Sequence, residues 1–245
     1  MERLAFAMEI RRFFVQPTDI VDNNVRLCGE EFHHAVKVLR HKVGFKIIVC
    51  DNSGNDYYAT ITEIRKDALT AKIDEVVAND TATSRKFTLY QCISRGDRLD
   101  FAVQKAVELG VREIVPVISD FSTEKAVNHD RLTRIISEAA KQCGLAILPT
   151  LTAPMTFADA VKRAGDTAIV FYEHEEKVII DKSALPKGDV GVFVGAEGGF
   201  SPEEIEFARQ SGARTVSLGK RILRTETATV AALTLTVYLA GEMNL

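Results

Sequence analysis

The sequence predicts an α/β domain with a mainly parallel sheet, preceded by a small β-barrel domain. Residues 11–77 hold short runs of β-branched and aromatic residues, whereas strand-like runs alternate with amphipathic helical segments from Phe87 onward. Between the two patterns, residues 78–84 are small and polar and are expected to form a linker. We therefore expect an N-terminal domain over residues 1–78 and a second domain over residues 79–245.

The first domain is predicted to consist mostly of short strands around one helix. The expected strands cover residues 11–15, 25–28, 45–51, 57–65 and 69–77, with a hairpin turn at residues 52–55. The helix places Phe32, Ala35, Val36 and Leu39 on one face, and its other side is partly basic. That basic side is either an ordinary solvated face or an RNA contact, since barrels of this size often present loops to RNA.

The second domain is predicted from regular alternation of strands and helices. The strand-like runs cover residues 87–93, 114–118, 145–151, 167–172, 190–194 and 215–218. Two intervening helices end at Gly110 and Gly144, and another covers residues 157–164. Ser201, Pro202 and Glu204 predict a capped helix that ends near Gly212, and Thr225 begins a last, largely apolar helix.

Two glycine-bearing loops form the candidate site. Strand 190–194 runs into Gly195, Gly198 and Gly199, and strand 215–218 runs into Gly219 and a basic segment. Ligands of open α/β sheets bind beyond the carboxyl ends of the strands, so we expect the two strands to be neighbours whose loops form one crevice. Neither loop matches a dinucleotide or P-loop motif, and tight turns without a ligand are the alternative interpretation.

The run GAEGGFSPEE, followed about twenty residues later by LGKRILRTETA, closely resembles the signature of the SPOUT methyltransferases, specifically the bacterial 16S rRNA uracil-N3 methyltransferase family. The blocks HHAVKVLRHKVGFKIIVCD, LDFAVQKAVELGVREIVPVIS and ISEAAKQCGLAILP extend the resemblance upstream. It implies a SPOUT-type trefoil-knotted domain preceded by a PUA-like β-barrel, where general rules predict an unknotted chain. It also implies S-adenosyl-L-methionine as methyl donor and a homodimer, which the apolar C-terminal helix favours as well.

The resemblance assigns roles within the two loops. The expected donor-binding residues are Gly195, Glu197, Gly198, Gly199, Leu218, Gly219, Ile222, Leu223 and Thr227. For catalysis, Arg224 is expected to stabilise the uridine anion and Glu226 to accept the N3 proton. A salt bridge or helix cap is the alternative for this pair, and Glu197 has the alternative of an ordinary acidic residue at a helix start.

RNA contacts are expected at Arg12, Arg40, Arg95, Lys220 and Arg221. Residues 209–224 carry five basic side chains and no acidic one, which favours phosphate binding. The family commonly has arginines where this chain has Phe121 and Leu145. The alternatives are therefore a SPOUT methyltransferase for another RNA or position, and a non-catalytic ribosome-binding relative.

Net charge, cysteine spacing and hydrophobicity limit the other classes of function that the chain could have. A formal net charge of −3 gives no general signal for nucleic acid, so local patches must bind the 16S rRNA or small ribosomal subunit. The four cysteines lack CxxC spacing and are expected to be buried free thiols in a reducing compartment, with no metal site. No apolar run reaches the length of a membrane span and no signal-peptide pattern is present, so we expect a cytoplasmic protein. The residues before Met8 are expected to be a loose tail or a start-site artefact.

Overall fold

The computed structural model describes residues 10–175 and 178–243, so the tail expected before Met8 lies outside the described residues. The chain divides into two compact units. The first runs to Ala82 and also includes Ala140–Leu148, and the second comprises Thr83–Ala139 and the residues from Pro149 onward. The domain boundary after residue 78 stays a prediction, because the structural division also assigns a later segment to the first unit.

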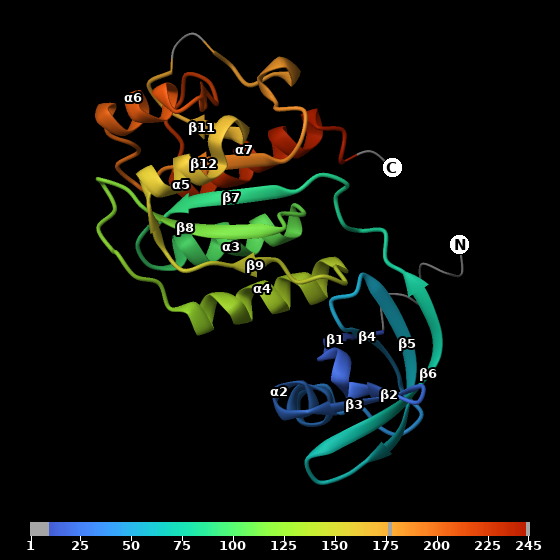
Figure 1. Ribbon diagram of the computed structural model, residues 1–245. Coiled ribbons are helices and arrows are strands. Elements are labelled where there is room, and N and C mark those ends of the chain that lie inside the picture. The colour runs from blue at the N-terminus through green and yellow to red at the C-terminus, as the bar shows by residue number, and fades with distance from the viewer. Residues whose placement is uncertain (1–9, 176–177, 244–245) are drawn as a thin grey trace. The chain divides into compact units, whose positions relative to one another are not determined.

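The first unit contains a curled six-stranded sheet with strand order β1-β4-β5-β6-β3-β2 (Figure 1). Its strands are β1 (Arg12–Phe14), β2 (Ile20–Val21), β3 (Asn24–Cys28), β4 (Lys46–Cys50), β5 (Asn55–Ile64) and β6 (Ala68–Ala78). β1 runs parallel to β4, and the other neighbours are antiparallel. Alternate side chains of β3 and β4, including Val25, Leu27, Ile47 and Val49, point into one buried cluster because side chains alternate across a strand.

The predicted helix of this unit is present but short. α2 (Gly29–His33) continues into a π-helical turn over His34–Val38, and Phe32 and Ala35 are buried in the core of the sheet. The expectation of buried cysteines is wrong for Cys28, which is exposed where β3 ends.

The second unit contains a seven-stranded sheet in which every strand pairing is parallel. Its strands are β7 (Phe87–Cys92), β8 (Glu113–Ile118), β9 (Thr150–Leu151), β10 (Met155–Thr156), β11 (Ala168–Phe171), β12 (Val190–Val194) and β13 (Arg214–Val216). The order is β10-β8-β7-β12-β11-β13, with β9 on β8. The strand expected over residues 145–151 is wrong except for β9, because Leu145–Leu148 belongs to the first unit and Pro149 lacks an N–H donor.

Helices cover both faces of this sheet (Figure 1). They are α3 (Asp97–Glu108), α4 (His129–Cys143), α5 (Phe157–Ala164), α6 (Pro202–Gln210) and α7 (Thr225–Leu239). Tyr90 and Cys92 of β7 pack in the cluster formed with α5 and α6. Gln91, which points to the opposite face, is hydrogen-bonded to Thr229 of α7, and α7 packs against α3. No helix in the described part of the chain is long and apolar enough to cross a bilayer.

Candidate functional site: a cleft at the carboxyl ends of the parallel strands

A cleft of about 560 Å³, partly open to solvent, lies beyond the carboxyl ends of β11 and β12. Its walls come from three segments: the residues that end β11, the glycine loop after β12, and the loop between β13 and α7. The lining residues are Phe171, Tyr172, Glu173, Val194, Gly195, Ala196, Glu197, Gly199, Leu218, Gly219, Arg221, Ile222, Leu223, Thr225 and Ala228. This is the edge of a parallel sheet at which ligands of α/β proteins bind.

The glycine loop is a tight turn that has no room for side chains at two positions. The Gly199 amide donates to the Ala196 carbonyl at 3.0 Å, and Gly199 has φ +69°. A Cβ placed on Gly195 would lie 2.9 Å from the Gly199 Cα, and one on Gly199 would lie 1.8 Å from Glu173 Oε1. Glycine at both positions therefore keeps backbone groups at the surface of the cleft.

The glycine loop leads directly into α6, whose start has the predicted capping box. The Glu204 amide donates to Ser201 Oγ at 3.2 Å, and Glu204 Oε2 accepts from the Ser201 amide at 3.0 Å. Burial raises the pKa of Glu204, partly against the hydrogen bonds from the Ser201 and Asp120 amides. These bonds fix where the glycine loop ends.

The second wall, Leu218 to Leu223, is tied to the first by one buried hydroxyl. Thr225 Oγ1 donates to the Gly195 carbonyl at 2.6 Å, and Gln91 Nε2 donates to Thr225 Oγ1 at 3.2 Å. Gly219 has φ +103°, a conformation that favours glycine, and 82% of the Ile222 side chain is exposed at the cleft. The start of α7 thus holds the glycine loop and the loop after β13 close to each other.

The third wall was missed by the sequence analysis. β11 lies between β12 and β13, so the two strands expected to be neighbours are not paired with each other. The carboxyl end of β11 therefore contributes Phe171, Tyr172 and Glu173 to the cleft. The sequence did predict a strand over residues 167–172, and parallel strands share one carboxyl edge, so its end could be expected near the cleft. Its position in the sheet between β12 and β13 could not be read from the sequence.

Seven of the nine expected donor residues line the cleft: Gly195, Glu197, Gly199, Leu218, Gly219, Ile222 and Leu223. Gly198 does not line it, since a Cβ at this position would point at the Phe121 side chain, 2.8 Å from its Cβ. Thr227 is exposed on the first turn of α7 and is also absent from the lining. The donor-binding roles of all nine residues stay predictions.

A carboxylate and two arginines surround the rim of the cleft. Glu197 Oε1 accepts from Arg98 Nη1 at 2.5 Å and from the Arg95 amide at 3.1 Å. Burial alone would raise the pKa of Glu197, but these hydrogen bonds and the Arg98 charge outweigh it and lower that pKa. Glu197 therefore stays ionised at neutral pH, where it holds the Arg98 side chain of α3 and the Arg95 backbone amide.

The two expected catalytic residues do not line the cleft. Arg224 is the exposed N-cap residue of α7, and its side chain makes no capping hydrogen bond. Glu226 lines a separate, open groove together with Arg95, Gly96, Asp97, Arg98 and Phe101. Its Oε2 lies 3.9 Å from Arg98 Nε and has no hydrogen-bond partner among the described residues. The contact with Arg98 thus supports the alternative interpretation in which Glu226 forms a salt bridge. The Arg224 side chain makes no capping hydrogen bond, so the alternative of a side-chain cap has no support for Arg224.

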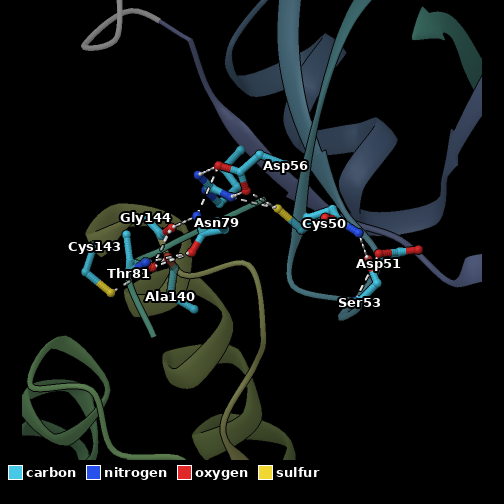
Figure 2. Close-up of polar contacts among 11 residues, drawn as sticks. Cys50, Asp51, Ser53, Asp56, Asn79, Thr81, Ala140, Cys143 and Gly144 are labelled. Carbon is cyan, nitrogen blue, oxygen red and sulfur yellow. Dashed lines mark hydrogen bonds and ion pairs between the residues drawn. The ribbon is translucent and has the colours of Figure 1, made fainter. Parts of the chain in front are cut away.

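Four of the five expected RNA-binding residues, Arg40, Arg95, Lys220 and Arg221, are exposed. The structure contradicts the expectation for Arg12, whose side chain is only 9% exposed. Its guanidinium is paired with Asp56, with Nη2 at 2.9 Å from Oδ2, and it also contacts Cys50. Figure 2 shows Asp56 between Cys50 and Asn79, which both hydrogen-bond to it. A buried, paired guanidinium is not accessible to phosphate.

The predicted basic patch is also smaller in the structure. Arg209 Nη2 pairs with Glu175 Oε2 at 2.8 Å, and Arg214 Nη1 donates to the Ala184 carbonyl at 2.8 Å. Arg209 and Arg214 are exposed but held by these contacts, whereas Lys220, Arg221 and Arg224 are exposed and form no ion pair among the described residues. Within the described ranges, no cluster of side chains has the composition of a metal site.

Comparison with known proteins gives matches over both predicted domains. A family model described as an RNA methyltransferase domain matches residues 81–237, and one described as an RNA methyltransferase PUA domain matches residues 27–74. The ribosomal RNA small subunit methyltransferase E of Bacillus subtilis is 31% identical over 229 residues, which cover 86% of this chain and 89% of that protein. The Rickettsia conorii protein of the same name is 29% identical and covers 92% of this chain and 94% of its own.

Solved structures agree. The ribosomal RNA small subunit methyltransferase E from Neisseria gonorrhoeae, bound to S-adenosyl methionine, superposes with a TM-score of 0.86 at 32% identity and covers 94% of this chain and 98% of its own. A methyltransferase from Legionella pneumophila, also in complex with this cofactor, gives a TM-score of 0.85 at 29% identity over 94% of this chain and 98% of its own. The predicted fold class, a SPOUT-type α/β domain preceded by a PUA-like barrel, is confirmed.

Proposed function

The chain belongs to the RNA methyltransferase family, and from this premise we propose that it methylates N3 of a uridine in the 16S rRNA of the small ribosomal subunit, with S-adenosylmethionine as the methyl donor. The observation that carries the proposal is the cleft at the ends of β11 and β12, walled by the two loops that resemble the family signature. Membership in the family makes the protein an S-adenosylmethionine-dependent rRNA methyltransferase. The position on the base is the finer part of the proposal.

The residues of the cleft fit this donor. The cleft is concave and lies at the sheet edge where small-molecule ligands of α/β proteins bind. The lining combines backbone groups of two glycine loops with Ile222 and Leu223, which suit an adenine ring, and with the Glu173 carboxylate, which suits hydroxyl or ammonium groups. No P-loop is present, and the donor has no phosphate that requires one. When bound, S-adenosylmethionine supplies an electrophilic methyl group on a sulfonium.

Around the cleft, the residues of this chain must orient the uridine and remove its N3 proton. Arg224, an exposed cation at the start of α7, is suited to stabilise negative charge on the uridine carbonyl oxygens. Glu226 is the proposed proton acceptor, because its buried Oε2 accepts no hydrogen bond from the described residues. Holding the base in an attack geometry supplies much of the remaining acceleration.

The proposed partners follow from the same chemistry. The proposed contacts to phosphates of the rRNA are three exposed cations: Arg221 at the cleft, the neighbouring Lys220, and Arg40 in the first unit. The homodimer implied by the resemblance and a cytoplasmic location are parts of the proposal, because the small subunit is assembled there.

Two measurements test the proposal. Calorimetry with S-adenosylmethionine and with its demethylated product tests donor binding. Nucleoside analysis of rRNA from a deletion strain, with and without the restored gene, tests the reaction. Loss and return of one N3-methyluridine in 16S rRNA is the expected result. Donor binding with a change at another base or RNA would favour another specificity, and intact rRNA methylation in the deletion strain would favour a non-catalytic relative.

A further inference from the structure

An exposed aromatic ring lies directly beside the glycine loop. Phe121 follows β8, and its side chain is 46% exposed. Its Cβ, Cγ and Cδ2 lie 2.8, 3.2 and 3.4 Å from the position of a Cβ built on Gly198. Gly198 stands between Glu197 and Gly199, which both line the donor cleft. The ring therefore lies against the glycine loop, next to two residues that line the cleft.

The backbone on both sides of Phe121 is held by hydrogen bonds. The Asp120 amide donates to Glu204 Oε1 at 3.0 Å, and Ser201 Oγ donates to Asp120 Oδ2 at 2.6 Å. On the other side, the Ser122 amide donates to the Ser119 carbonyl at 3.0 Å. The loop that presents Phe121 is thus fixed to the start of α6.

Arginine side chains lie close to the loop that carries Phe121. Arg95 Nε donates to Thr123 Oγ1 at 2.9 Å, which joins the Phe121 loop to the loop before α3. Arg95 and Arg98 both line the open groove that contains Glu226. Proteins that bind single-stranded nucleic acid combine such cations with exposed aromatic rings, because cations contact the backbone while bases stack on the rings.

We propose that the Phe121 ring stacks on an unpaired nucleobase of the RNA substrate at the rim of the donor cleft. This inference rests on the proposed function, since it names the residue that holds a base of the RNA beside the site of methyl transfer. A base must leave its helical stack before an enzyme can act on its Watson–Crick edge, and an aromatic face replaces part of the lost stacking. Phe121 is accordingly a substrate-binding residue.

A fluorescence experiment detects the stacking directly. The chain contains no tryptophan, so Phe121→Trp introduces a single reporter. Titration of this variant with oligouridylate is expected to quench the tryptophan emission, because a stacked base quenches indole fluorescence. A matched control is Phe207→Trp on α6, where Phe207 is half-buried near Lys162 and away from the cleft. Fully base-paired RNA is expected to leave both variants unquenched.

Affinity measurements then separate stacking from charge and from folding. Phe121→Leu keeps an apolar side chain but removes the aromatic face, and it is expected to weaken RNA binding about 5- to 150-fold, equivalent to ~1–3 kcal/mol. Phe121→Tyr should retain the affinity of the unchanged protein. The dependence of binding on salt should be the same in all three proteins, since no phosphate contact is lost. Calorimetry should show unchanged affinity for S-adenosylmethionine.

The outcome is independent of whether the proposed reaction is correct. If the protein methylates rRNA but Phe121→Leu binds RNA normally and Phe121→Trp is not quenched, the stacking inference is wrong and the proposed function stands. If quenching and weakened binding are seen without any methylation of rRNA, the stacking holds and the reaction must be reassigned. Weakened donor binding in Phe121→Leu would show that the ring only supports the glycine loop, and this would overturn the inference.

Discussion

Gly199 combines a left-handed backbone conformation, which favours glycine, with a crowded position in the cleft. Gly199→Ala is expected to weaken donor binding at least tenfold, because the added methyl group enters the lining of the cleft and meets the Glu173 carboxylate. Gly212→Ala is the matched control, since Gly212 also has a positive φ, +88°, but an added Cβ there meets nothing within 4 Å. Both variants should lose ~1–3 kcal/mol of stability, and calorimetry should find a donor-binding defect only in Gly199→Ala. Equal donor affinities in the two variants would remove Gly199 from the site.

Arg224 tests the proposed stabilisation of the uridine anion. Arg224→Ala is expected to lower the single-turnover rate at saturating RNA by ~10²–10³, with little change in donor affinity. Raising the pH should recover part of this rate, because solvent then supplies more N3 anion. Lys220→Ala, which removes another exposed cation of the same loop, should instead weaken RNA binding and reduce its salt dependence. A normal saturated rate in Arg224→Ala would make Arg224 a phosphate contact.

Arg12 is expected to stabilise the fold, not to bind RNA. Burial alone would raise the pKa of Asp56, but hydrogen bonds from Arg12 and Asn79 outweigh it and lower that pKa. The Asn79 bond is drawn in Figure 2. A carboxyl group whose folded pKa is lowered contributes stability above its unfolded pKa of about 4, and this stability is lost as the pH falls through the folded pKa.

Arg12→Met leaves Asp56 buried without its cation, and denaturant unfolding at neutral pH should show a loss of ~3–5 kcal/mol. The deficit should begin to narrow above about pH 4, because burial without the cation raises the Asp56 pKa in the variant, and it should narrow further below about pH 4, where the unchanged protein loses its ion pair. The exposed pair Arg65–Glu63 provides the control, and Arg65→Met should unfold like the unchanged protein. A pH-independent deficit in Arg12→Met would contradict the role of the ion pair.

At the scale of elements, local patterns predicted most helices and strands, because apolar periodicity and caps depend on neighbouring residues. The range of α5, the start of α7 and the Ser201 capping box are as predicted. The order of strands depends on distant pairings, and for this reason the place of β11 between β12 and β13, and with it Glu173, was missed. The burial of Arg12 depends on Asp56, 44 residues away, and was missed for the same reason.

The start of α7 joins the fold to the site through two threonines on one buried face. Thr225→Val removes the hydrogen bond to the Gly195 carbonyl and is expected to weaken donor binding about tenfold or more, because the glycine loop loses its tie to the second wall. Thr229→Val, one turn later, removes the hydroxyl that contacts Gln91 Oε1 and the Thr225 carbonyl, and it should cost ~1–3 kcal/mol of stability with donor affinity unchanged. Calorimetry and denaturant unfolding of both variants separate the two effects. The interpretation is wrong if Thr229→Val affects donor binding as strongly as Thr225→Val.

For the whole molecule, the main feature is that the apolar helix α7 is only partly covered by its own chain. After Glu226 the helix has no charged residue, and a helix that is apolar all round is normally buried on every side. Its own chain buries Leu233 and Val237, whereas Leu235 is 38% and Tyr238 is 62% exposed. α3, which packs on α7, adds Phe101 at 43% exposure. These side chains belong to a face that a second copy of the chain is suited to cover.

We therefore expect a homodimer with two-fold symmetry through the α3 and α7 face, since an isologous contact lets one apolar surface cover another of the same kind. Sedimentation at micromolar concentration should give about twice the 27.0 kDa mass of one chain. Leu235→Glu places a charge in the proposed contact and should shift the protein to the monomer, because an unpaired carboxylate is costly to bury. Val76→Glu adds the same charge at a 52% exposed position of β6 and should remain dimeric. A monomeric unchanged protein would refute the dimer, and dissociation by both substitutions would show that added charge, not loss of this face, separates the chains.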